Sequence, residues 1–464
     1  MKKGIVARLD SVNEFEREPV PVSKLKSFKN FLGMYAGEHT AGTEFVIGPL
    51  FVAHGVSAID LVVGLLVGNL LAVLSWAFLT APIAVKTRVT MYFQLEKICG
   101  TGLVKVYNIV NGLMFCFLAG SMIAVSATAV GIPFGIPMPS LNDLYPNSVS
   151  WVITVFAIGS ITTIVAMFGY SWVSKFSNIA APWMILIFFA AAIASLPHLG
   201  VEKITDFWAV ANEKIWTGNV LPGQSKFTLW HVVFFSWFAN MAMHIGMSDL
   251  SILRYAKKWQ YGFTSATGMF VGHYFAWIAS GILYALFLQQ SGQSTEFAPG
   301  VIAFQAAGIA GAVCVVIAGW TTANPTIYRA GLALQTINPS FKTWKVTLVT
   351  GLITTIAACF PALVMKLLDF VALYGLLLMP MGAVIFIDFW VLKRLSLQTN
   401  YAEKSGLQIN WAAGLTWVVT LAICVLINMT MGVEIFFLGL PGWFIASLLY
   451  IVLSKVLQKK QLAF

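Results

Sequence analysis

Twelve long apolar segments follow one another along the chain, each bounded by polar residues, glycine or proline. A helix of roughly 20 mainly apolar residues is long enough to cross a bilayer. The pattern therefore predicts an all-α polytopic membrane protein with twelve transmembrane helices. The predicted spans cover residues 31–54, 57–84, 103–131, 150–169, 178–198, 229–249, 262–289, 301–328, 346–365, 367–392, 410–430 and 434–456.

The first span carries polar residues in its middle, namely Glu38, His39, Thr40, Thr43 and Glu44. Ionisable groups are costly at membrane depth and normally face a cavity, an ion or a buried partner. On an unbroken helix these groups would lie on nearly every side. We therefore expect a span that unwinds at its glycines and contributes to a binding site. The alternative is a glycine-rich packing helix whose acids pair with other buried groups.

The sixth span has the same kind of interruption, with Asn240, His244, Gly246 and Asp249 inside an apolar run. Interrupted spans in corresponding positions of two halves are typical of inverted-repeat transporters. Spans 1–5 and 6–10 would then be antiparallel copies. The expected division is a tail (1–30), repeat 1 (31–198), a loop (199–228), repeat 2 (229–395) and spans 11–12 with the C-terminal tail (396–464).

The eighth span offers oxygen ligands at one place. Thr321 and Thr322 are adjacent, and Pro325 leaves the carbonyl of Thr321 without its helical donor. Hard cations such as Na⁺ take oxygen ligands. Threonines in membrane helices also bond simply to the carbonyl one turn back, which is the alternative interpretation.

The composition agrees with a membrane protein. Of 464 residues, 59% are hydrophobic and 10% are charged, whereas a soluble domain has about 25% charged residues. Mean hydropathy is +0.83. The N-terminal 30 residues lack the apolar core of a signal peptide. The five cysteines are scattered and predict neither a metal site nor a disulfide framework.

The net charge of +10 follows from topology rather than from nucleic-acid binding. With the N-terminus in the cytoplasm, 24 of the 28 basic residues fall in the tails and in loops on that side. The positive-inside rule therefore places both termini in the cytoplasm of a multi-pass plasma or inner membrane protein.

Four carboxylate and basic groups near span ends predict ion pairs. The fourth of these is a basic pair: Asp249 is expected to pair with Arg254, and Asp388 with the adjacent Lys393 and Arg394, as gate elements or ion pairs.

The passage WTTANPTIYRAGLALQ resembles the nucleobase–cation symporter-1 family, which includes cytosine, purine, uracil, allantoin and hydantoin permeases. The passages GVSAIDLVVGLLVGNLL, SDLSILRYAK and LLDFVALYGLLLMPMGAVIFIDFWVLKR resemble its spans 2, 6 and 10. The match covers most of spans 1–10. It implies a LeuT-type fold of five-plus-five inverted repeats with discontinuous helices 1 and 6. It also implies alternating access and a planar heterocycle carried with Na⁺ or H⁺, with no other cofactor.

The resemblance also implies site residues. The family's sodium site corresponds to Thr321, Thr322 and the carbonyl of Ala318, with span-1 carbonyls between residues 36 and 42, Ala36 and Thr40 among them. Its substrate lies between aromatic groups of spans 3 and 6, and polar groups of spans 1, 6 and 8 contact the substrate edge. The matching positions here are Phe115, Phe117, Trp237, Phe238, Asn240, Thr43 and Asn324.

The sequence departs from the family at several of these positions. Span 3 has phenylalanines where tryptophan is frequent, and span 1 has two acids, Glu38 and Glu44. A carboxylate can accept two N–H bonds from a heterocycle or bind a cationic amine. Either acid could instead carry a proton, with His39, His244 or His273 as relay, or form a fixed Glu–His pair.

Other functions compete less well. A LeuT-type carrier of a cationic amine or amino acid is the alternative within transport. Against an enzyme, the chain has no HExxH and no GxxxxGK[ST] motif. Against a channel or sensor, it has no repeated filter motif and no soluble signalling domain. The expected partners are a small-molecule substrate and the lipid bilayer, and the expected state is a monomer.

Overall fold

The twelve predicted spans all contain helix. The computed structural model describes residues 5–42, 44–139, 143–291, 299–360, 362 and 367–461. Within these residues, nine helices are long and apolar enough to cross a membrane. Three shorter apolar helices, Glu44–Ala53, Leu229–Phe238 and Thr343–Ala358, fall in predicted spans 1, 6 and 9. The two shortest of these belong to the spans for which the sequence predicts a break.

Most spans are single helices near the predicted bounds. Span 2 is α4 (Ala58–Ser75) with π-helix η2 (Trp76–Thr80) and α5 (Ala81–Thr87), followed by the short helix α6 (Met91–Cys99). Spans 3 to 5 are α7 (Thr101–Gly131), α8 (Val149–Met167) and α9 (Tyr170–Leu199). Span 7 is η5 (Trp259–Thr264), π-helix η6 (Thr267–Tyr274) and α14 (Phe275–Ser291). Spans 8 to 12 are α15 (Pro299–Gln335), α16 (Thr343–Ala358), α18 (Leu367–Trp390), α20 (Trp411–Met431) and α21 (Gly439–Gln461).

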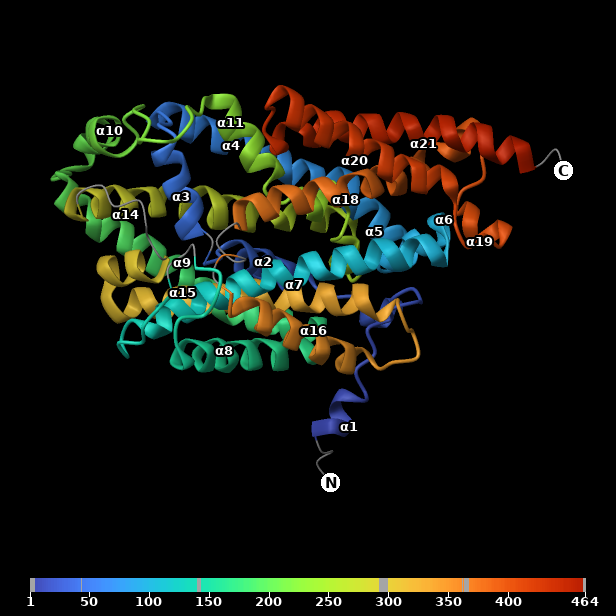
Figure 1. Cartoon of the computed structure of the whole chain (residues 1–464), viewed down its shortest axis with the longest axis horizontal. Helices are drawn as coiled ribbons and strands as arrows, with labels where there is room; N and C mark the ends of the chain where they lie inside the picture. Colours follow the sequence, from blue (N-terminus) through green and yellow to red (C-terminus); the bar gives the residue numbers. More distant parts are fainter. Residues whose placement is uncertain are drawn as a thin grey trace.

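Helices α7 and α15 form the most extensive helix pair and run side by side through the molecule (Figure 1). Small residues allow this close approach. A Cβ atom at Gly319 of α15 would lie 1.9 Å from the Ser126 hydroxyl oxygen of α7. Helices α20 and α21 pack on α18 and on each other at the edge of the bundle (Figure 1).

Peripheral helices present large apolar side chains to their surroundings. Ile164 of α8, Leu426 of α20 and Leu448 of α21 are 54%, 61% and 65% exposed. In water such surfaces would be unfavourable, whereas lipid accommodates them at no hydrophobic cost.

Span 1 is broken at the predicted place. Helix α2 (Phe28–His39) ends before Thr40–Gly42, which are not helical, and α3 begins at Glu44. Span 6 is interrupted too. Helix α11 (Leu229–Phe238) is followed by the short α12 (Met241–His244) and then by irregular backbone, in which Met247 has φ of +63°. The interruptions leave main-chain groups of both spans available at the centre of the molecule.

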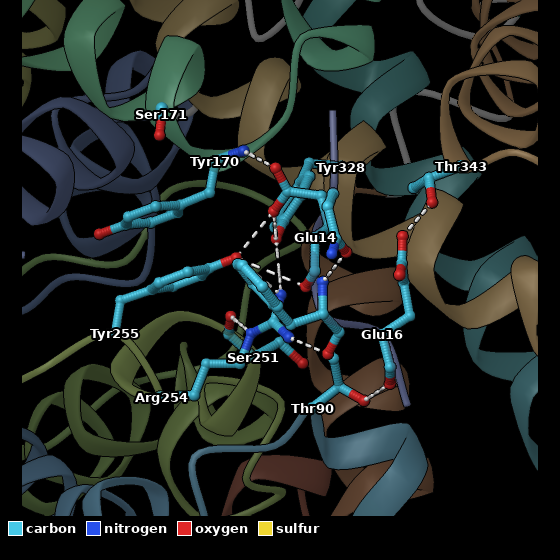
Figure 2. A network of polar contacts seen from close by, with 12 residues as sticks. Glu14, Glu16, Thr90, Tyr170, Ser171, Ser251, Arg254, Tyr255, Tyr328 and Thr343 are labelled. Carbon is cyan, nitrogen blue, oxygen red and sulfur yellow. Dashed lines mark hydrogen bonds and ion pairs between the residues drawn. The ribbon is translucent and has the colours of Figure 1, made fainter. Parts of the chain in front are cut away.

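The N-terminal segment is fastened to several helix ends by a buried carboxylate. Glu14 accepts hydrogen bonds from the hydroxyls of Tyr328 (2.7 Å) and Tyr255 (2.9 Å) and from the backbone N–H of Tyr170 (3.2 Å) (Figure 2). The guanidinium of Arg254 lies 3.8 Å from the same carboxylate and donates to the carbonyl of Phe15. Burial raises the pKa of the Glu14 carboxyl, while the positive charge of Arg254 acts in the opposite direction. Through this one side chain, the segment joins α9, α15 and the connection that follows α13 (Leu250–Leu253).

Two neighbouring contacts extend this attachment. The hydroxyl of Thr343 donates to the carboxylate of Glu16, and the hydroxyl of Thr90 donates to its carbonyl (Figure 2). A third contact comes from the backbone N–H of Lys26, which donates to the carbonyl of Tyr255 at 2.8 Å.

The predicted Asp249–Arg254 pair is wrong, because the guanidinium of Arg254 contacts Glu14 and Phe15 of the N-terminal segment instead.

Replacing Glu14 by alanine should destabilise the protein. The change leaves the guanidinium of Arg254 buried without its carboxylate, a loss worth about 3 kcal/mol or more in comparable buried pairs. We expect a lower melting temperature and faster hydrogen exchange in residues 10–20. Glu18→Ala removes the same charge from an exposed side chain and should change neither. Equal behaviour of the two variants would contradict the role assigned to Glu14.

Candidate functional site

A central cavity lies where the break of span 1 meets the break of span 6. It is lined by residues of α2, α3, α7, α11, α12, η6, α15 and α18. Its polar lining consists of Glu38, His39, Glu44, Asn240, His273, Thr322 and Thr326, and its apolar and aromatic lining includes Leu118, Met122, Phe235, Phe238, Tyr374 and Phe436. A mostly apolar cavity with a few convergent polar groups is typical of a small-molecule site.

Next to this cavity, Arg329 is fully buried between two carboxylates. Its guanidinium donates to both oxygens of Glu38, at 2.5 and 3.1 Å, and to Asp249 at 2.6 Å. None of the three side chains is more than 5% exposed. A charge this deep is tolerated only with opposite charges and hydrogen bonds around it. The triad joins α2, α15 and the connection after α12.

Two further donors hold Asp249. The indole N–H of Trp76 and the hydroxyl of Tyr35 both donate to its second oxygen, at 2.7 and 2.9 Å. The carboxylate of Asp249 therefore accepts hydrogen bonds from three separate segments. The position of the Asp249 carboxylate is thus held by Trp76 of π-helix η2 and Tyr35 of α2 as well as by Arg329.

The predicted eighth span ends at residue 328, which leaves Arg329 just outside it. That predicted end is wrong, because α15 continues to Gln335 and carries Arg329 inside the helix. A single basic residue in the apolar run TIYRAGLAL was the available signal. A buried arginine also explains why span 1 tolerates Glu38.

Glu44 lies at the start of α3, on a different wall of the cavity. The indole N–H of Trp277 donates to one of its carboxylate oxygens. The other oxygen lies 3.9 Å from Nε2 of His273. The two acids of span 1 thus have different surroundings, one with arginine and the other with tryptophan and histidine.

The candidate cation ligands of spans 1 and 8 are brought together in part. The hydroxyl of Thr322 donates to the carbonyl of Glu38 at 2.9 Å and to that of Ala318 at 3.2 Å. The hydroxyl of Thr321 bonds to the Ala318 carbonyl and lies 3.6 Å from the sulfur of Met184. The nearest span-1 carbonyl is therefore that of Glu38.

The other two span-1 candidates for that site face one another. The carbonyl of Ala36 accepts bonds from both the N–H and the hydroxyl of Thr40, at 3.0 and 2.8 Å. These two bonds close the last turn of α2, and both residues lie within the 36–42 range named as candidate cation ligands.

Of the four predicted aromatic groups, only Phe238 lines the cavity. Trp237 stacks on Phe238 and donates its N–H to Ser75, while Phe115 packs edge-on against Tyr374. Neither Phe115 nor Phe117 belongs to the lining, whose α7 members are Leu118 and Met122. Tyr374 of α18, which the sequence analysis did not single out, supplies an aromatic group instead.

The remaining predicted polar residues lie at different depths. Asn240 lines the cavity and its amide lies 3.4 Å from Nε2 of His273. Asn324 is buried outside the lining, and its side-chain amide has no hydrogen-bond partner among the described residues. His244 is also buried outside it, with Nε2 bonded to the carbonyl of Trp237. Thr43 lies outside the described residues.

His39 lies between the arginine triad and His273. Its Nδ1 is bonded to the carbonyl of Tyr35 at 2.9 Å, and its ring contacts that of His273 with centroids 5.2 Å apart. It lines the cavity, as do three other proton-coupling candidates, Glu38, Glu44 and His273, whereas His244 does not.

The prediction for Asp388 is wrong. Its carboxylate accepts hydrogen bonds from the backbone N–H of Asn400 and the hydroxyl of Tyr450, at 3.0 and 3.1 Å. Lys393 and Arg394 are exposed and do not pair with it. The residue therefore connects α18 to α21, remote from the cavity.

Solved structures resemble this fold over nearly the whole chain. A nucleobase–cation-symport-1 family transporter, Mhp1, in a closed conformation with bromovinylhydantoin bound, has a TM-score of 0.73 at 15% identity, covering 96% of each chain. The inward-facing conformation of Mhp1 gives a TM-score of 0.67.

More distant transporters have the same architecture. A Na⁺-coupled sialic acid symporter gives 0.63 at 15% identity, covering 94% of this chain and 89% of its own. MhsT in complex with L-phenylalanine gives 0.59 at 15% identity, covering 92% and 98%. No family model and no curated protein sequence matches the chain. The chain is thus an all-helical polytopic membrane protein with the LeuT fold, as predicted.

Replacing Arg329 by methionine should destabilise the protein strongly. The variant leaves Glu38 and Asp249 buried side by side without their cation, and breaking such a pair costs about 3–5 kcal/mol. We expect a melting temperature at least about 5 °C lower. Arg394→Met, which removes an exposed arginine, is the control and should behave like the wild type. A stable Arg329→Met variant would show that the triad is dispensable for folding.

Proposed function

We propose that this protein is a secondary active transporter that moves a small molecule through its central cavity by alternating access. The observation that carries the proposal is the meeting of two broken spans over that cavity, with Thr322 linking the carbonyls of Glu38 and Ala318. Broken spans at the membrane midplane expose main-chain dipoles for substrate and coupling ion. Two of the structures with a similar fold are described as a nucleobase–cation-symport-1 family transporter and a Na⁺-coupled sialic acid symporter.

The substrate we propose is a planar heterocycle of the nucleobase or hydantoin type. Phe238 and Tyr374 offer aromatic faces, and stacking a base on such a face contributes roughly 1–3 kcal/mol. Glu44 and Asn240 offer hydrogen-bonding groups for its edge. Support also comes from the sequence resemblance and from the hydantoin bound to Mhp1.

A cationic amine or amino acid is the second candidate. It is favoured by the two acidic side chains, Glu38 and Glu44, in the cavity lining. Because Arg329 already holds Glu38, Glu44 is the group that would receive the amine.

For the coupling ion we propose Na⁺ bound by the hydroxyl of Thr322 and the carbonyls of Ala318 and Glu38. The hydroxyl oxygen of Thr322 already lies 2.9 Å from the carbonyl oxygen of Glu38 and 3.2 Å from that of Ala318. Thr321 would supply a fourth ligand after a side-chain rotation that turns its hydroxyl away from the sulfur of Met184.

The proposed topology has both termini in the cytoplasm and two inverted repeats, residues 31–198 and 229–395, in a monomer. Its support is the distribution of basic residues. Arg254 and Arg329 leave that count because they are buried, and the exposed basic residues still favour the same orientation.

The proposal is tested by thermal stability of the purified protein against cytosine, uracil, hypoxanthine, hydantoin, phenylalanine and choline, each with NaCl or KCl. A ligand of the folded state raises the melting temperature by mass action. We expect a rise with a flat heterocycle that is larger in Na⁺. A rise with choline or phenylalanine alone would favour the second candidate, and no rise with any compound would count against this substrate range.

Replacing Thr322 by valine should abolish the stabilisation by Na⁺, because it removes one ligand and the link to span 1. We expect at least a tenfold weaker Na⁺ dependence of the melting temperature. Thr350→Val is the matched control, since its buried hydroxyl bonds only to the carbonyl of Val346 within α16. Unchanged Na⁺ dependence in Thr322→Val would refute this cation site.

A further inference from the structure

His273 reaches the cavity from a π-helical stretch, η6 (Thr267–Tyr274). Such stretches are rare and are frequent at functional sites, because the wider turn redirects a side chain. Here η6 packs against the last turn of α2. A Cβ atom at Gly272 would lie 2.3 Å from the carbonyl oxygen of His39. Only glycine permits this approach, which places His273 beside the break of span 1.

The imidazole of His273 is held on two sides. Its ring stacks on Trp277 with centroids 4.3 Å apart and an interplanar angle of 16°. The amide of Asn240 lies 3.4 Å from Nε2, and the carboxylate of Glu44 lies 3.9 Å from the same atom. Trp277 also donates its N–H to Glu44, so one tryptophan positions both groups.

A carboxyl and an imidazole at this distance can share one proton. An imidazolium within about 4–6 Å of a carboxylate is favoured by the opposite charge. Both side chains are almost fully buried, 2% and 5% exposed, and both line the cavity. Binding one proton cancels the negative charge of the pair, which makes closure of a low-dielectric cavity less costly.

We propose that Glu44 and His273 form a proton-binding site in the wall of the central cavity, separate from the proposed Na⁺ site. The proton enters from the cavity, is held by the pair, and accompanies the substrate across the membrane. This inference rests on the proposed transport function and adds H⁺ as a second coupling ion. It also assigns a functional residue to span 7.

Other titratable groups face this pair from the surrounding helices. Helix α2 contributes His39, whose ring contacts His273, and Glu38, which is occupied by Arg329 of α15. Helix α12 contributes His244, whose ring packs on Trp76. Tyr35 and Asp249 are bonded to each other beyond His39. In α4, which also packs on η6, Asp60 lies in the first turn. None of the groups on these helices lies between Glu44 and His273.

The test is a titration of each histidine by hydrogen–deuterium exchange at the imidazole C2 position, read by mass spectrometry on the full chain in nanodiscs. In Glu44→Gln, the midpoint of His273 should fall by at least one pH unit, a tenfold loss of proton affinity. In Glu44→Asp, which keeps the negative charge, the midpoint of His273 should fall less than in Glu44→Gln. His198, whose side chain is exposed, serves as internal control and should not shift. An unchanged His273 midpoint in Glu44→Gln would overturn the proposal.

Access from the cavity is tested by pH jumps on supported membranes containing the protein and no substrate. Wild type should give a transient current that falls at least fivefold in His273→Gln, while the response to a Na⁺ jump persists and shows that the variant is folded. Equal pH-jump currents would refute the site. These readouts need no substrate, so an empty result in the stability panel would count against the proposed function and leave this titration unaffected.

Discussion

The ion triad of Glu38, Arg329 and Asp249 is the interaction on which the centre of this structure depends. Each carboxylate alone would be intolerable at membrane depth, and so would the guanidinium. Together they connect the broken spans 1 and 6 to span 8. The breaks expose backbone that needs fixed partners, and the triad supplies a rigid support within one turn of each break. The cavity is built on that support.

Much of the fold could be predicted from the sequence because its signals are local. Apolar length defines a span, and polar residues with glycine in the middle of a span predict a break. The breaks in spans 1 and 6 both follow from such signals. The ends of helices are less certain, and the extra turns of α15 changed Arg329 from an apparent loop residue into the central cation. The end of an apolar run therefore does not mark the end of the buried helix, because α15 continues beyond it.

The candidate site was predicted less completely, since it is made by pairs remote in sequence. Glu38 and Glu44 were recognised as unusual, but nothing local could show that one meets Arg329 and the other meets Trp277. Aromatic residues are common in this chain, so choosing Phe115 or Phe117 rather than Tyr374 depended on helix rotation. The π-helical turn that presents His273 leaves no clear mark in the sequence. Partner identity and helix register are tertiary properties.

Tyr328 and Arg329 are consecutive residues of α15, yet they belong to two different polar groups. Tyr328 bonds to Glu14 of the N-terminal segment, and Arg329 bonds to Glu38 beside the cavity. A rotation of this helix would disturb both at once, because a single peptide unit separates them. Thermodynamic reciprocity sets the consequence: if a ligand in the cavity rotates this helix and so changes the hold on the N-terminal segment, that hold changes ligand affinity by the same factor. One turn of α15 thus carries both the attachment of Glu14 and the attachment of Glu38.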